Sequence, residues 1–172
     1  MGRSSIIENK TPYQECREEL GYSREKASEL LKWISADRLD RIEHEKVIPQ
    51  PDEVFEMSKT YRRPSLCNYY CSNQCKIGRQ YVPEIKMKNL SQIILEMLAS
   101  LNSIGKRQER LIEITADGQI TEDEIEDFVH IQKELERISI TVETLQLWSE
   151  RMLATGTINM DAYNKFMNSK KL

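Results

Sequence analysis

Cysteines are the residues of this 172-residue chain whose type and spacing could support chemistry. Cys67, Cys71 and Cys75 recur every four residues in the segment CNYYCSNQC, so on a helix they form a stripe along one side. Thiolates at this spacing can share a metal ion, and tetrahedral Zn²⁺ needs a fourth ligand, for which Cys16 is available. An iron–sulfur cluster and a thiol redox sensor are alternatives. The paired C-x-x-C of a zinc ribbon is absent, so the cysteines also fit a structural role as small buried residues.

Catalysis has no comparable signal in the sequence. The two histidines, His44 and His130, stand apart from any nucleophile or carboxylate at a recognisable spacing. Motifs that bind nucleotides or form hydrolase active sites do not occur either. We therefore expect that the protein is not an enzyme, and that it needs no cofactor unless zinc or an iron–sulfur cluster binds at the cysteines.

A second set of polar residues accompanies two short segments with helical apolar spacing. Ser23 and Ser35 can each cap one of these segments, and Ala27 is small enough to let the two helices pack closely. Leu39 and Ile42 would face a core. The side chains left pointing outward from the second segment are then Ala36, Asp37, Asp40, Arg41 and His44.

These features resemble the Xre/Cro/phage-repressor type of helix-turn-helix protein. The resemblance lies in LGYSREKASELLKWISADRLDRIEHEKVIPQPDEVFEMSKTY and extends over residues 11–75. Its matching elements are Leu20-Gly21, Ser23, Ala27, Leu30, Ile34-Ser35, Leu39, Ile42-Glu43 and the proline-containing loop that follows. Two departures occur: the segment from Leu30 to Ile34 is one or two residues longer than the family's turn, and Glu45-Lys46 stands where a glycine is common.

The resemblance implies a sequence-specific transcriptional regulator that binds double-stranded DNA. The family's base-reading positions fall on Ala36, Asp37 and Arg41, with His44 on the same face. Arginine can pair with guanine through two hydrogen bonds, and aspartate can accept one from cytosine. The candidate phosphate contacts are Arg24, Lys26, Arg38 and Lys46. Because Asp37, Asp40 and Glu45 would repel phosphates, the alternative is a helix-turn-helix adaptor that binds a protein instead of DNA.

Five short helices are expected to position these residues. The predicted helices begin at Thr11-Pro12, Ser23, Ser35, Pro51 and Pro64, where capping residues or prolines favour a helix start. The sequence therefore predicts a five-helix, lambda-repressor-like DNA-binding domain over residues 11–77, followed by a linker at residues 78–83.

Two long helices are expected beyond the linker. Apolar residues recur at alternating spacings of three and four from Leu90 to Leu111 and again from Phe128 to Met152, which is typical of a coiled-coil seam. Asp117-Gly118 would form the turn of an antiparallel hairpin, and a short last helix would cover residues 159–167. A second apolar face on the later helix indicates that residues 84–172 form a homodimer.

Composition agrees with an all-α protein. The chain contains 39% hydrophobic and 31% charged residues but only six glycines and five prolines, which is typical of a globular, helical protein. No run of 18 apolar residues could span a membrane, and MGRSSIIENK has no apolar secretory core, so a cytoplasmic location is expected. The net charge is −3, but Lys and Arg outnumber Asp and Glu by 14 to 13 in residues 1–80.

Overall fold

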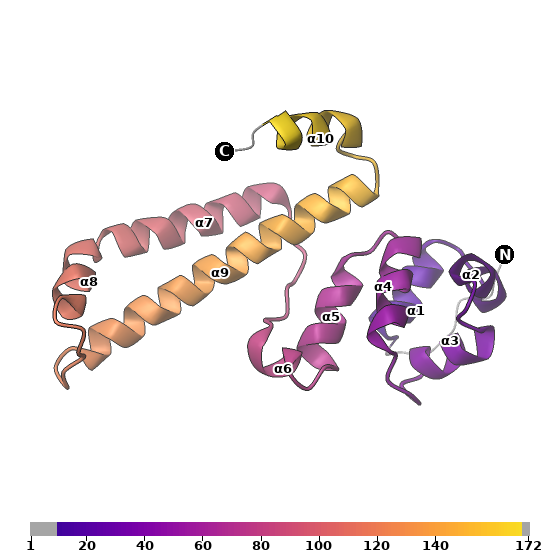
Figure 1. The fold of residues 1–172 in the computed structure, drawn as a ribbon, viewed down its shortest axis with the longest axis horizontal. Helices are drawn as coiled ribbons and strands as arrows, with labels where there is room; N and C mark the ends of the chain where they lie inside the picture. Colours follow the sequence, from indigo (N-terminus) through magenta and orange to yellow (C-terminus); the bar gives the residue numbers. More distant parts are fainter. Residues whose placement is uncertain (1–9, 170–172) are drawn as a thin grey trace. The chain divides into compact units, whose positions relative to one another are not determined.

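Helices alone make up the regular structure of the protein. The structure is a computed structural model that describes residues 10–169, and within this range it contains ten helices and no strand (Figure 1). The all-α prediction is confirmed. The first nine residues of MGRSSIIENK, the segment in which the sequence shows no apolar secretory core, lie outside the described residues. The chain divides into two compact units, one comprising residues up to Glu84 together with those from Ser149 onward, the other comprising Ile85–Trp148.

Five helices and a short sixth one form the N-terminal part of the first unit. They are α1 (Pro12–Glu19), α2 (Arg24–Leu31), α3 (Ala36–Glu43), α4 (Pro51–Thr60), α5 (Ser65–Asn73) and α6 (Gly78–Tyr81). The side chains of Thr11, Ser23 and Ser35 cap the first three helices, each by accepting a hydrogen bond from the backbone N–H three residues later. These are the caps that the sequence predicts, and they fix where each helix begins.

The core of this unit is assembled from all five longer helices. The side chains of Ile34, Leu39 and Met57 are at most 1% exposed. The remaining buried members of the cluster are Tyr13, Cys16, Ala27, Leu31, Ile42, Val54, Tyr61 and Leu66. Because α2 and α3 contribute to this single core, their relative orientation is set by packing rather than by the short turn between them.

The segment predicted as a linker is partly helical. Gly78 begins α6 and is buried against the end of α5. A Cβ added at Gly78 would lie 2.1 Å from the backbone carbonyl oxygen of Cys71, a distance that no side chain tolerates. Only glycine therefore allows α6 to fold back on α5, and the sequence pattern alone gave no sign of this contact.

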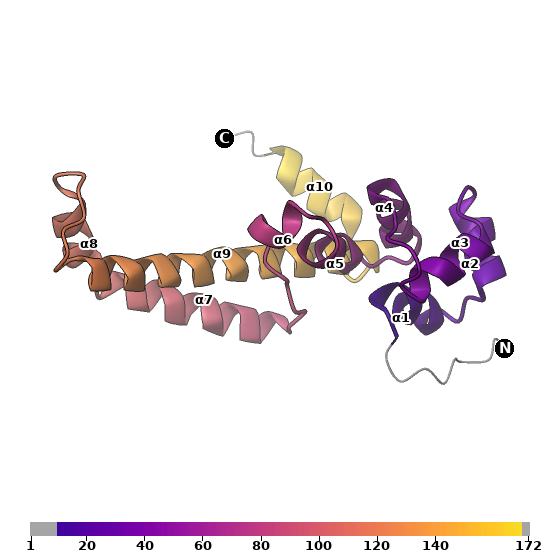
Figure 2. The same ribbon diagram turned by 90° about the horizontal axis from the view of Figure 1, so that it is seen from below.

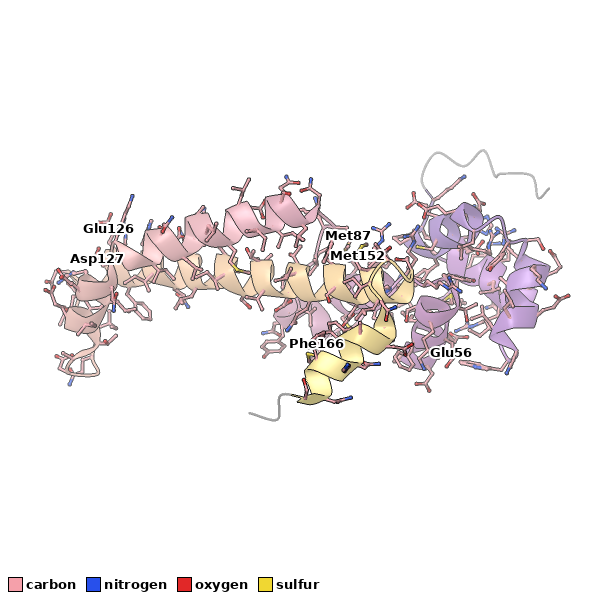
Figure 3. All side chains as sticks on the ribbon, turned by 90° about the horizontal axis from the view of Figure 1, so that it is seen from above. Glu56, Met87, Glu126, Asp127, Met152 and Phe166 are labelled. Carbon is pink, nitrogen blue, oxygen red and sulfur yellow. The ribbon has the colours of Figure 1, made fainter. Side chains whose placement is uncertain are left out.

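A helical hairpin forms the second unit. It contains α7 (Leu90–Gly105), α8 (Gln108–Thr115) and most of α9 (Ile125–Ala154), and α10 (Met160–Ser169) follows α9. The helices α7 and α9 run alongside each other in opposite directions, with α8 at the far end (Figures 1 and 2). The expected turn is confirmed, since Gly118 has φ +73° and Thr121 N–H donates to Glu124 Oε2 at 3.0 Å.

Two details of the hairpin differ from prediction. The expected single helix from Leu90 to Leu111 is broken after Gly105, where Arg107 adopts φ −115° and ψ 9°. The apolar seam is also turned away from the helix contact: Leu101 is 49% and Val142 40% exposed, whereas Ser100 and Thr141 are buried. Each buried residue precedes a predicted seam residue by one position, which corresponds to a rotation of about 100°. Two helices alone cover only one stripe each, so seam residues such as Leu101 and Val142 stay exposed, whereas Ile131 of the same seam is 4% exposed.

Candidate nucleic-acid interface

The turn between α2 and α3 contains one residue in a left-handed conformation. Lys32 ends α2 with φ 65°, and α3 begins at Ala36. Within this turn Ile34 is 1% exposed and anchors the backbone in the core, while Trp33 is 57% exposed. The longer turn noted in the sequence is thus accommodated by the left-handed Lys32 and by the insertion of Ile34.

The C-terminal end of α3 is tied to α1 and α2 through Glu43. The carboxylate of Glu43 accepts hydrogen bonds from Arg17 Nε at 2.5 Å and Arg17 Nη2 at 2.8 Å, and from Arg24 Nε at 2.8 Å. The side chain of Glu43 is 1% exposed. Burial alone would lower the pKa of Arg17, but the hydrogen bond and the charge of Glu43 outweigh burial and raise this pKa. The result is a charged network that fixes α3 against its neighbours.

The N-terminal half of α3 is tied to α4. Arg38 donates from Nε and Nη2 to the two carboxylate oxygens of Glu53, each at 2.7 Å. Glu53 also accepts a hydrogen bond from the backbone N–H of Gln50 at 2.6 Å, which closes a capping box at the start of α4. Arg38, which the sequence predicts to contact phosphate, therefore already has a paired carboxylate partner.

Asp40 lies among three basic side chains. Its carboxylate is 3.3 Å from Arg24 Nη1, 3.2 Å from His44 Nδ1 and 3.4 Å from Lys46 Nζ. Burial alone would raise the pKa of Asp40, but these three neighbours outweigh it and lower this pKa. The acidic side chain is thereby compensated within the fold, so Asp40 repels phosphate less than the sequence suggests.

The outer face of α3 leaves few cations uncommitted. Asp37 and Arg41 are exposed and Ala36 is half-buried. Within residues 10–169, Arg41 takes part in no ion pair, whereas Lys26 pairs with Glu29 at 3.0 Å on the surface. Among the predicted base-reading residues, Arg41 is thus the one whose donors face solvent and are free to bind.

Two residues beside α3, Lys32 and Trp33, are not among those that the sequence predicts to contact DNA. Lys32 is exposed and, in the part of the chain that the structure describes, forms no ion pair. Trp33 exposes 57% of its surface directly before the N-terminus of α3, where an indole N–H can donate to an anion. The only sign of an exposed Trp33 in the sequence is its place immediately before an apolar residue and a helix-capping serine.

No family model, no curated protein and no solved structure matches the chain. No helix within residues 10–169 is long and apolar enough to cross a membrane.

The cysteines form a stripe but not a metal site. Within residues 10–169 no group of three or more His, Cys, Asp or Glu side chains is arranged to hold a metal ion. Cys16 is buried in the core, where burial raises its pKa to about 11 despite the nearby Arg63. Cys67, Cys71 and Cys75 are half-buried along and just beyond α5. The four thiols predicted as a ligand set are therefore not brought together in this structure.

Proposed function

We propose that the protein is a sequence-specific DNA-binding transcriptional regulator in which α2 and α3 form a lambda-repressor-like helix-turn-helix. The observation that carries the proposal is a helix α3 that is fixed at both ends by buried carboxylates, while Arg41 stays exposed and unpaired on its outer face. A helix that reads the major groove must be held at a fixed angle by other helices. Arg41 then supplies the two parallel donors that recognise guanine.

We further propose that two copies act together through the hairpin. An exposed apolar face, defined by its large side chains, runs along one flank of α7 and α9. Its members are Leu90, Ile94, Leu98, Leu101, Phe128, Leu135 and Val142, each 37–51% exposed. The hairpin interior is mixed: it buries Ile93, Ile131 and Leu147, but it also buries the polar residues Ser100, Glu134, Thr141 and Thr144. A symmetric four-helix bundle would cover the apolar face, and would present two copies of α3 to half-sites roughly 34 Å apart.

The test of DNA binding starts from genomic fragments retained by the purified protein. On the selected site, Arg41→Ala should weaken binding by about 5- to 150-fold, which corresponds to the loss of one bidentate base contact. Arg79→Ala is the matched control, since Arg79 is an exposed arginine on α6, and it should bind as the wild type does. Retention of no fragment even at low salt would refute the proposal.

The test of dimerisation is the mass of the full chain by light scattering. Leu98→Glu places a charge in the centre of the apolar face and should shift the mass from a dimer to a monomer. Ile77→Glu is the control, because Ile77 is a 72% exposed residue outside the hairpin and should leave the mass unchanged. A wild-type monomer at tens of micromolar would remove the dimer from the proposal.

A protein-binding adaptor is the second candidate, and the surface beside α3 favours it. Leu30 is 40% and Trp33 57% exposed, and two of the predicted phosphate contacts, Arg24 and Arg38, are engaged in ion pairs. Exposed tryptophan is enriched at the centre of protein interfaces. Under this alternative, Trp33→Ala would abolish binding to a protein partner, and no DNA fragment would be retained.

A further inference from the structure

The hairpin contains a hollow on the flank opposite its apolar face. This hollow encloses about 370 Å³ between α7 and α9, which lies within the range of small-molecule sites. Its lining includes Lys88, Glu96, Ala99, Ser100, Arg137 and Ile140. All belong to the same compact unit.

Helix geometry explains why the hollow and the apolar face lie on opposite flanks. Each residue of α7 is turned by about 100° from the one before, and Ser100 is buried against α9. Leu101 then falls on one side of the contact and Ala99 on the other. A dimer formed through the apolar face would therefore leave the hollow open.

Small side chains create the hollow. Ala99 and Ser100 of α7 lie across from α9 where a larger residue would fill the gap, and Ile140 supplies an apolar wall. Alanine and serine thus leave a space with one apolar side and one polar side, which suits an amphipathic molecule rather than a bare ion.

The hydroxyl of Ser100 belongs to the lining of the hollow. The residue is 8% exposed, and its side chain forms no hydrogen bond to any residue between 10 and 169, in contrast to two buried threonines of α9. Thr141 donates to the carbonyl oxygen of Arg137 at 2.8 Å, and Thr144 to that of Ile140 at 2.6 Å. A hydroxyl that lines the hollow and has no partner among the described residues is free to exchange a hydrogen bond with a ligand atom.

Arg137 is the cation at the hollow that keeps unused hydrogen-bond donors. Lys88 Nζ is committed to the two carboxylate oxygens of Glu96, at 2.7 and 2.6 Å. The guanidinium of Arg137, in contrast, donates one hydrogen bond among the described residues, from Nη1 to Glu134 at 2.9 Å, and is 69% exposed. Its remaining N–H groups can form the two-pronged contact that a carboxylate accepts.

We infer that this hollow binds a small organic carboxylate with an apolar body. The carboxylate would accept hydrogen bonds from Arg137, the body would lie against Ala99 and Ile140, and a ligand oxygen would meet Ser100. A role for this ligand as an effector rests on the proposed regulatory function, but its binding does not.

The experiment titrates the full chain with hexanoate and follows backbone amide resonances by NMR, with no DNA present. Saturable shifts are expected at Ala99, Ser100 and Ile140. Arg137→Gln should weaken binding at least about tenfold, because it removes the charge-assisted contact. Lys106→Gln is the control, since Lys106 is an exposed lysine of the same hairpin that does not line the hollow.

Three outcomes would overturn the inference. One is the absence of saturable shifts up to about 10 mM hexanoate, because a few contacts should already give a millimolar dissociation constant. Another is binding of 1-hexanol as tight as that of hexanoate, since the alcohol lacks the carboxylate. The third is unchanged affinity in Arg137→Gln. The Ser100→Val variant, which removes the hydroxyl and narrows the hollow, should weaken the shifts if the inference holds. Because DNA is absent, failure here leaves the DNA-binding proposal untouched.

Discussion

Replacing Glu43 by glutamine should severely destabilise the unit that contains α3. The substitution preserves shape, but it puts an amide NH₂ where guanidinium donors of Arg17 and Arg24 now converge. Arg17 is 5% exposed, so its charge would be left buried without compensation. Removing one partner of a buried pair costs about 3–5 kcal/mol. About 75 ordered residues carry roughly 4–11 kcal/mol of stability, so Glu43→Gln should remove about a quarter of it or more.

The assay is urea-induced unfolding at neutral pH, followed by far-ultraviolet circular dichroism. Because the hairpin also contributes helical signal, amide hydrogen exchange at Leu39 assigns the transition to the unit that contains α3. Glu29→Gln is the matched control: Glu29 pairs with Lys26 on the surface and is 69% exposed, so its loss should change stability by less than about 0.5 kcal/mol. Thermal unfolding should show the same difference between the two variants: Tm should fall by at least about 12 °C in Glu43→Gln but not in Glu29→Gln.

A double variant separates the charge from the packing. Arg17→Met combined with Glu43→Leu removes both charges of the pair and keeps similar volume, and such replacements are often neutral. The double variant should therefore be more stable than Glu43→Gln by at least about 2 kcal/mol. A cost below about 1 kcal/mol for Glu43→Gln would refute the role of this network in holding α3. Strictly additive effects of Arg17→Met and Glu43→Leu in their double variant would refute it as well.

Three further outcomes follow from buried polar groups. The Tyr61 hydroxyl is buried without a partner, so Tyr61→Phe should keep or raise the urea midpoint; Tyr13→Phe, which loses a 2.8 Å hydrogen bond, should lower stability by about 1 kcal/mol. Burial alone would raise the pKa of Glu53, but hydrogen bonds, led by that from Arg38, lower this pKa below 4.5. The stability that Glu53 contributes is therefore present above pH 4.5 and is lost as the pH falls through the lowered pKa. Urea titrations at successive pH values should show that Glu53→Gln flattens this acid dependence. The thiol of Cys16, whose pKa burial raises to about 11, should react with a thiol reagent only on unfolding, and rapid modification of all four thiols of the native protein would contradict its burial.

Local signals predicted the starts and the core residues of α2 and α3 well because they act within a few residues. The capping serines Ser23 and Ser35 fixed the starts of two helices, and apolar spacing identified Leu39 and Ile42 as core residues. The ion pair between Arg38 and Glu53 joins residues 15 positions apart. Such pairs depend on how helices pack, so no spacing rule assigns Arg38 to Glu53 rather than to phosphate.

The hairpin shows where periodicity alone is insufficient. A seam with alternating spacings of three and four predicts which residues share a flank of a helix, but not which flank meets which neighbour. Here Ser100 and Thr141 lie in the helix contact, and the adjacent Leu101 and Val142 are exposed. The break after Gly105 was missed for a related reason, because the apolar pattern continues across it.

Under the proposed function, the distribution of charge around α3 would make DNA binding depend on dimerisation. Arg24 and Arg38 are held by carboxylates within the fold, which leaves Arg41 and Lys32 as cations without ion pairs beside the turn among the described residues. Nonspecific affinity grows with the number of phosphates neutralised, so one copy with so few free cations would bind weakly. Two copies joined through the hairpin double the contacts without a second loss of translational freedom. The exposed apolar face and the sparse charge of α3 therefore both support the proposal of a regulator that binds DNA only as a dimer.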